Sequence, residues 1–276
     1  MDTEDLPIDK DTLVVKISDL HSGGTTALFP DEIQYFKHGN HTPSEYQLRL
    51  YSHWEKCARI VSFLRKKKRL VIVHNGDAID GVHHKSPQSV TTLKNEQIDL
   101  HVLLMKRFMK LVKFNSGDRL YYTTGTESHT NDNEDLIGRK MGAVMSKDLY
   151  VFDELELMVN GRRLWFAHKG PSPGKGANQG NALYNYIRDL WIDYKTNNKP
   201  TPDVVVFSHF HTARKRTHDR VVAGRINTLH GWILPSMQQK TRYAYGCVSL
   251  QMNDIGIAYH EITKSGDIIN NDFELM

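Results

Sequence analysis

Five short, mostly apolar runs are spread along the chain, and a polar cluster directly follows each of them. The runs span residues 13–17, 70–73, 120–122, 164–166 and 204–207. Their β-branched and aromatic residues and their length are typical of buried strands, so each run predicts one β-strand. Because the carboxyl ends of parallel strands meet at one edge of a sheet, we expect the five polar clusters to lie close together.

Apolar residues at helical spacing occupy three of the stretches between these runs. Thr42-Pro43-Ser44-Glu45 has the form of a capping box with proline in the first helical position, and an apolar stripe continues from there. We therefore expect a helix over residues 43–66. Similar stripes predict helices over residues 92–114 and 178–195.

The second half of the sequence shows hairpin signals. Asn160-Gly161 separates two strand-like segments and predicts a tight turn between antiparallel strands. Residues 247–250 and 255–259 flank a polar turn and predict a second hairpin. Strand–helix–strand units followed by antiparallel strands favour an α/β fold in which two sheets pack together with helices outside. The long irregular stretch of residues 21–41 follows the first polar cluster, and we expect it to form a rim over the site.

Length and composition agree with one enzyme domain. The 276 residues are enough for a single large α/β domain over 1–276, with its core at about 12–263. The acidic start of the sequence and the absence of a long apolar run predict neither export nor membrane insertion. With 2 cysteines against 15 histidines, a reducing, cytoplasmic location and an imidazole-based metal site are favoured.

The net charge of +4 does not demand a nucleic-acid partner and disfavours an architectural nucleic-acid-binding protein. Residues 65–69 form a basic run at the end of a predicted helix, where solvated cations complement the helix dipole. Residues 214–216 form a second basic run directly after the last polar cluster. The cations of this second run either steer a phosphate-bearing substrate or are ordinary surface charges.

The polar clusters contain residue types that bind transition metals. They are Asp19-Leu20-His21, Gly76-Asp77, Gly125 to His129, His168 and His209-Phe210-His211. A mixture of imidazole and carboxylate ligands suits Mn, Fe, Zn or Ni better than Ca or Mg. One such segment has little meaning by itself, because a buried histidine is more often a hydrogen-bonded part of the core. The ordered set predicts a metal site.

In their order, these blocks resemble the calcineurin-like metallophosphoesterase superfamily, whose motifs are D-x-H, G-D-x-x-D, G-N-H-D/E, H and G-H-x-H. The corresponding segments are Asp19-Leu20-His21, Gly76 to Asp80, Gly125 to His129, His168 and Ser208 to His211. Three segments look like those of a bacteriophage or prophage branch, which would place the enzyme in the host cytoplasm: residues 80–84, the block 125–129, and the glycine-rich segment after His168 that leads into 180–183. The resemblance implies a four-layer α-β-β-α sandwich with two mixed β-sheets, as in metallophosphatases.

The resemblance also implies a dinuclear centre that holds two divalent transition-metal ions, with Mn²⁺ favoured and Fe, Ni or Zn as alternatives. By residue match, Asp77 bridges the two metals and is central to catalysis. The other implied ligands are Asp19, His21 and His211 at the first site, and His168 and His209 at the second.

The third block departs from the family motif, because Thr126 and Glu127 follow the glycine where the family has asparagine and histidine. In the family this asparagine is a second-site ligand and the histidine assists the leaving group. A threonine hydroxyl is a weaker ligand, so either Glu127 or His129 fills the second site, or that site is weak. Glu127 is therefore a candidate ligand, and His129 is a candidate ligand or catalytic proton donor.

Four further residues are candidates for substrate contact. Lys169 and Lys175 lie in a glycine-rich cationic segment without P-loop spacing, which is either a phosphate contact or an ordinary loop. His83 and His84 either reach the substrate or are surface histidines. We expect a metal-dependent phosphodiesterase or phosphatase that acts on a phosphoester such as a nucleotide or nucleic acid. The alternatives are a nuclease acting on DNA or RNA, and a metal- and phosphate-binding module without catalysis.

Overall fold

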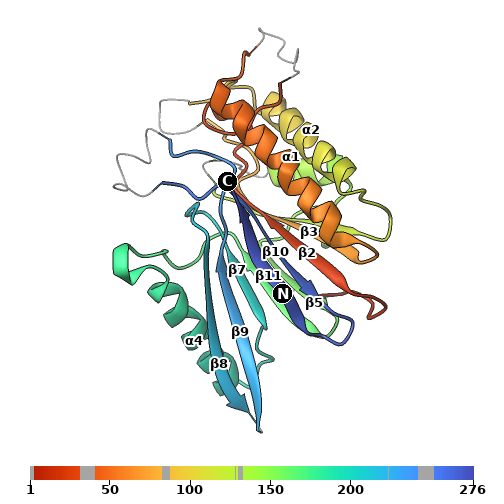
Figure 1. The fold of residues 1–276 in the computed structure, drawn as a ribbon, viewed down its shortest axis with the longest axis vertical. Coiled ribbons are helices and arrows are strands. Elements are labelled where there is room, and N and C mark those ends of the chain that lie inside the picture. Colours follow the sequence, from red (N-terminus) through yellow and green to blue (C-terminus); the bar gives the residue numbers. More distant parts are fainter. Residues whose placement is uncertain are drawn as a thin grey trace.

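Two β-sheets packed face to face form the centre of the fold, with helices on both outer faces (Figure 1). The computed structural model describes residues 3–31, 41–82, 88–127, 129, 133–222, 224–241 and 252–276. Its helices are α1 (Glu45–Arg65), α2 (Lys94–Leu111), α3 (Asn133–Met141) and α4 (Asn181–Thr196), with a 3-10 turn at Gly176–Asn178. Its strands are β1 (Thr3–Asp5), β2 (Thr12–Ile17), β3 (Arg69–Asn75), β4 (Arg119–Thr123), β5 (Glu154–Val159), β6 (Arg162–Ala167), β7 (Val204–Phe207), β8 (Arg214–Val222), β9 (Arg225–Ile233), β10 (Gly256–Ile262) and β11 (Ile268–Leu275).

Both sheets are mixed. The first has the order β11-β10-β2-β3-β4, in which β2, β3 and β4 run parallel and β10 is antiparallel to its two neighbours. The second has the order β1-β5-β6-β7-β9-β8, in which β6, β7 and β9 run parallel. The strands β5 and β8 are antiparallel to β6 and β9, respectively. The predicted polar clusters follow the carboxyl ends of parallel strands in both sheets.

Three hydrophobic clusters define four layers. The first cluster, which includes Trp54 of α1 and Phe108 of α2, lies between the helices and the first sheet. The second cluster joins the two sheets and includes Val71 of β3 and Phe166 of β6. The third cluster includes Ile187 of α4 and packs that helix onto the second sheet. The predicted α-β-β-α sandwich is therefore confirmed.

Strand β2 is buried on both faces, which explains its nearly continuous apolar sequence. Leu13 and Val15 belong to the cluster beneath the helices, whereas Val14 belongs to the cluster between the sheets. The exception is Lys16, whose ammonium group lies 3.4 Å from the centre of the Trp232 ring and 2.9 Å from Nδ1 of His260. Burial lowers the pKa of Lys16 well below its usual value.

The three predicted helices are confirmed as α1, α2 and α4, with ends that differ by one to three residues from those predicted. Helix α1 is capped by Ser44, whose side chain accepts a hydrogen bond from the backbone of Gln47 while the Gln47 side chain returns to the backbone of Ser44. The predicted capping box at residues 42–45 was therefore two residues early, because Ser44 is still extended and its partner is Gln47. Helix α3 was not predicted, since its nine residues bury only Ile137 and Met141 as large apolar side chains.

The five predicted strands and the first hairpin are confirmed. Asn160 and Gly161 join β5 to β6 with φ angles of 48° and 77°, as a two-residue turn between twisted strands requires. The predicted strand at 247–250 lies outside the described residues. Strand β10 is paired on one side with β2 and on the other with β11. Strands β1 and β11 extend the sheets beyond the predicted core at 12–263.

The described part of the stretch after His21 packs into the core and does not form the predicted rim. In its described part, most residues from Ser22 to Pro30 are buried, and Leu28 and Phe29 join the cluster beneath the helices. This segment therefore packs into the core because it is rich enough in apolar side chains to do so. Residues 32–40 lie outside the described part. Among the described helices, none combines the length and apolar character needed to cross a membrane.

Candidate metal centre

The predicted ligands come together at the carboxyl ends of four strands. Asp19 and His21 follow β2, Asp77 follows β3, His168 follows β6, and His209 and His211 follow β7. They form adjoining groups of metal-binding atoms that lie within 4.8 Å of one another in each group. These groups are Asp19, His21 and His211; His21, Asp77 and His129; and Asp77, His168 and His209. Since His21 and Asp77 each belong to two groups, the donors form one continuous site.

The donor atoms point at one another. Nε2 of His21 lies 3.2 Å from Nε2 of His211, and the latter lies 3.1 Å from Oδ1 of Asp19. Nε2 of His168 lies 3.1 Å from Oδ2 of Asp77. Asp19 and Asp77 are 0% and 1% exposed, so two carboxylates are held side by side in a buried place that contains several imidazoles. Such a set of buried anions and imidazole nitrogens fits divalent transition metals.

Five of these residues have a left-handed backbone. The φ angles of Asp19, His21, Asp77, His209 and His211 are 50°, 44°, 51°, 72° and 51°. This conformation is unfavourable for residues with a side chain, and it is concentrated at functional sites where surrounding structure enforces it. Here it turns the chain sharply as it leaves β2, β3 and β7. Glycine would adopt these angles more easily, but it has no donor atom to offer.

Gly76 and Gly125 of the motifs have no room for a side chain, because other parts of the site approach them closely. A Cβ atom on Gly76 would lie 2.4 Å from Nδ1 of His168. A Cβ atom on Gly125 would lie 2.3 Å from the backbone nitrogen of Asp77. Both glycines therefore let neighbouring loops reach the same donors, and any side chain at either position would push the loops apart.

Opposite charges in the site shift one another's pKa values. Burial alone would raise the pKa of Asp77, but His168 and His21 hold it below its usual range. Burial alone would lower the pKa of His168, but the neighbouring Asp77 raises it to about 9. Despite burial, His211 and His21 hold the pKa of Asp19 well below normal. Both carboxylates are therefore anionic at neutral pH.

We expect the metal-free protein to lose stability as the pH rises through about 9. The pKa of His168 is higher in the folded chain than the usual value of 6.5, so its bound proton stabilises the fold fully below about 6.5. That contribution, roughly 3 kcal/mol at most, disappears as the pH passes the folded pKa. Thermal unfolding in a chelator at several pH values from about 7 to 10 measures it. A His168→Gln variant should show a shallower dependence, and equal slopes for the two proteins would contradict this explanation.

Thr126 lies among the donors of the group formed by Asp77, His168 and His209. Its hydroxyl oxygen lies 3.2 Å from Oδ2 of Asp77, 3.3 Å from Nε2 of His168 and 3.2 Å from Nδ1 of His209. Its backbone nitrogen also donates a hydrogen bond to Asp77. The sequence identified Thr126 only as a departure from the family motif, although its position directly after Gly125 was the available signal. Glu127 is exposed and is not part of any donor group among the described residues.

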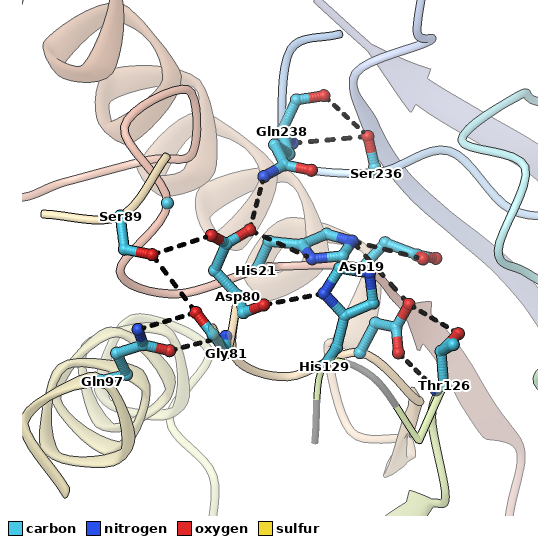
Figure 2. Close-up of polar contacts among 12 residues, drawn as sticks. Asp19, His21, Asp80, Gly81, Ser89, Gln97, Thr126, His129, Ser236 and Gln238 are labelled. Carbon is cyan, nitrogen blue, oxygen red and sulfur yellow. Dashed lines mark hydrogen bonds and ion pairs between the residues drawn. The ribbon is translucent and has the colours of Figure 1, made fainter. Parts of the chain in front are cut away.

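Asp80 supports two histidines of the site, as Figure 2 shows. Its carboxylate lies 3.7 Å from Nδ1 of His21 and accepts hydrogen bonds from Ser89 and Gln238. Its backbone carbonyl lies 2.7 Å from Nδ1 of His129. Because a carbonyl only accepts, Nδ1 of His129 carries the proton, and its Nε2 is left for the group that contains His21 and Asp77. Asp80 was recognised from sequence only as part of a motif.

Asn75 ties the loops together beneath the donors. Its amide donates to the carbonyl of Ala167 and to the hydroxyl of Ser208, and it accepts a hydrogen bond from Thr123. Its own carbonyl lies 2.8 Å from Nδ1 of His168. These bonds fix the ends of β3, β4, β6 and β7 relative to one another. Such supporting contacts orient ligands for metal binding.

The candidate substrate contacts are less well placed. Lys169, directly after His168, and Lys175 both have exposed side chains on the loop that leads to α4. His83 and His84 lie outside the described residues. Both lysines can therefore meet a ligand from solvent.

No model of a known protein family matches the chain, and no curated protein matches it in sequence. Among solved structures, a Thermotoga maritima protein determined by NMR in solution is similar over 96% of this chain and 98% of its own, with 18% identity and a TM-score of 0.35. The NAD nucleotidase of Haemophilus influenzae is similar over 96% of this chain and 49% of its own, with 12% identity and a TM-score of 0.40. Similarities this remote identify no reaction, so function must be inferred from the site.

Proposed function

We propose that this chain is a metal-dependent phosphoester hydrolase of the calcineurin-like type, in the cytoplasmic phage or prophage branch that its motifs resemble. The supporting observation is the continuous donor site in which Asp77 and His21 each belong to two adjoining groups. A histidine that only packs in the core, or an acid that only faces solvent, has no need to lie among several other metal-binding side chains. Three loops enter it with left-handed ligands at a conformational cost, which indicates a functional site.

Two divalent transition-metal ions fit these donors, and Mn²⁺ is the first choice. The first ion would be held by Asp19, His21, Asp77 and His211, and the second by Asp77, His168, His209 and the hydroxyl of Thr126. When bound, such a pair neutralises phosphate oxygens and lowers the pKa of water.

The other parts of the proposed reaction depend on side chains of the protein itself. Asp19 and Asp77 supply two buried negative charges at neutral pH, because their pKa values are lowered. The ring of His129 packs against that of His21, with the two ring centres 4.6 Å apart in an edge-to-face arrangement. From there His129 either serves as a ligand or gives a proton to the leaving oxygen. The exposed Lys169 and Lys175 attract the phosphate from solvent.

Removing one histidine from each site should remove one metal ion. We expect His211→Ala to lose the first ion and His168→Ala the second, so elemental analysis should find about one ion fewer in each variant. His41→Ala removes a half-buried histidine that is in none of the donor groups, and it serves as the matched control. If the wild-type chain saturated with Mn²⁺ never holds more than one ion, the dinuclear proposal is wrong.

The competing function is a metal-supported phosphate-binding module that lacks catalysis. Thr126 favours it, because a neutral hydroxyl beside Asp77, His168 and His209 is a weaker ligand than the amide of the family motif. Hydrolysis of a chromogenic phosphodiester with Mn²⁺ decides between the two functions. A panel of monoesters, diesters, nucleotides and single- and double-stranded DNA, with Mn²⁺, Ni²⁺ and Zn²⁺, then defines the substrate. No turnover of any substrate by fully loaded protein would support the module.

A further inference from the structure

A row of basic side chains runs along one face of β8. Arg214, Arg216, His218 and Arg220 alternate with residues of the opposite face, as the two-residue period of a strand requires. Their face turns toward α4. The His218 ring lies 5.6 Å from that of Tyr184, the Arg220 guanidinium lies over Trp191 at 5.5 Å, and Arg216 donates to the carbonyl of Gln179 just before α4.

The row begins at the metal centre and leads away from it. Arg214 pairs with Ile233 of β9, and Ile233 also pairs with Phe207, the last residue of β7. The start of β8 is therefore at the sheet edge where His209 and His211 follow β7. From this edge β8 extends beside α4 to the far end of the molecule (Figure 1). A chain bound along the row would have one end at the candidate metal centre.

The positive charge of the row lies on its three arginines, because His218 is buried, burial lowers its pKa, and its Nε2 accepts a hydrogen bond from Arg220. Most of the arginine charge is not neutralised. Among the described residues, the acid that is ion-paired with the row is Asp254, which lies 3.2 Å from Arg214. Arg216 is exposed and donates only to the backbone carbonyls of Lys215 and Gln179. Arg220 donates to Nε2 of His218 and has no acidic partner in the described part of the chain. The Arg216 side chain also packs closely against Gly180, since a Cβ atom on this glycine would lie 2.6 Å from its Nε.

Two exposed aromatic rings accompany the charges. Phe210, between the ligands His209 and His211, is 37% exposed and its ring lies 5.2 Å from that of His209. Tyr184, at the start of α4, is 39% exposed beside His218. A cationic track with flat apolar rings is how proteins bind single nucleic-acid strands, because phosphates meet the charges and bases stack on the rings.

We propose that this row binds a single strand of nucleic acid and guides its phosphodiester backbone to the metal centre, so that the substrate is a polynucleotide. The inference rests on the proposed hydrolase function. Side chains on one face of a strand repeat at about 7 Å, which is close to the separation of successive phosphates in an extended single strand. A rigid duplex does not offer its phosphates in one straight line at this spacing, so a single strand is the better fit.

The test is binding of a labelled oligothymidylate of about 20 nucleotides, measured by fluorescence anisotropy in a chelator over a range of salt concentrations. Arg216→Ala combined with Arg220→Ala should raise Kd about tenfold or more and make the salt dependence shallower by roughly 1.4 in log–log slope, the value for two lost phosphate contacts. The Lys replacement at both positions keeps the charges and should keep most of the affinity. Lys67→Ala with Lys110→Ala removes two exposed charges near α1 and in α2, and should change neither quantity.

Several outcomes would overturn the inference. These are no binding by the wild-type protein, a preference for duplex over single strand, equal loss in the Ala and Lys double variants, or equal loss in the control. Because the measurement needs no metal and no turnover, it is separate from the hydrolase proposal. If the wild-type chain binds the strand yet cleaves no ester when loaded with Mn²⁺, the hydrolase proposal fails while the binding row stands. If both hold, kcat/KM for the oligonucleotide should fall about tenfold more than that for a chromogenic diester in the Ala variant.

Discussion

Replacing Asp77 by asparagine is expected to abolish phosphoester hydrolysis, with a loss of about 10³-fold or more. Asp77 is the carboxylate that two of the three donor groups share, and it lies 3.1 Å from His168 and 3.9 Å from His21. Asparagine has nearly the same shape but no negative charge, so both proposed metal ions should bind more weakly. Its carbonyl oxygen still accepts the hydrogen bond from the backbone of Thr126, and the loop should keep its place.

Rates with a chromogenic diester and metal content by elemental analysis check this prediction together. Asp148→Asn, which changes an exposed acid away from the donor groups, is the matched control and should behave as the wild type. Circular dichroism and thermal unfolding in a chelator establish that the Asp77→Asn variant is folded. A variant that keeps two metals and substantial activity would show that Asp77 does not bridge them.

The second large effect is expected from His129→Ala, which separates the two roles left open for this histidine. If His129 protonates the leaving oxygen, the variant should keep both metals and lose rate by about 10²–10⁴-fold. The loss should shrink for a nitrophenolate ester, because a low-pKa leaving group departs without protonation. If His129 is a ligand in the group with His21 and Asp77, the variant should lose metal, and a good leaving group should not rescue it.

Metal content and rate, measured with one poor and one good leaving group, distinguish these roles. The hydrogen bond between Nδ1 of His129 and the carbonyl of Asp80 favours the ligand role, since it leaves an unprotonated Nε2 toward the site in the neutral ring. Glu127→Gln is the companion variant, because Glu127 is exposed and outside the donor groups. Unchanged rates and metal content in His129→Ala, together with a loss in Glu127→Gln, would transfer the role to Glu127.

Strands and ligands were predictable from the sequence for related reasons. Runs such as Val204–Phe207 are buried on both faces, so their apolar character persists without interruption and identifies the strand. Candidate ligands such as His209 stand directly after these runs, so the strand ends determine where they lie. Helix α3 and strand β1 lack this signal because they are short, and edge strand β11 lacks it because it is largely exposed and polar residues interrupt its apolar ones.

The contacts that support the site could not be predicted from the sequence pattern. Nothing near Asp80 in the sequence indicates that its carboxylate meets Gln238, 158 residues away, or that its carbonyl orients His129. In the sequence Thr126 looked like the loss of a ligand, yet its hydroxyl lies among the donors Asp77, His168 and His209. The basic row on β8 was visible only as the run 214–216, because its other members alternate with residues of the opposite face.

The sequence by itself determined the alternation of buried strands and amphipathic helices and the identity and order of the candidate metal-binding residues. Both follow from local chemistry: burial demands apolar side chains at a fixed period, and metals demand imidazole and carboxylate groups. Only the tertiary structure decided which donors lie together, which backbone carbonyls contact His129 and His168, and that β8 extends a line of arginines from the site. Those relations join residues that are distant in the chain, and they depend on ångström-scale distances set by the packing of two sheets, which no local pattern records.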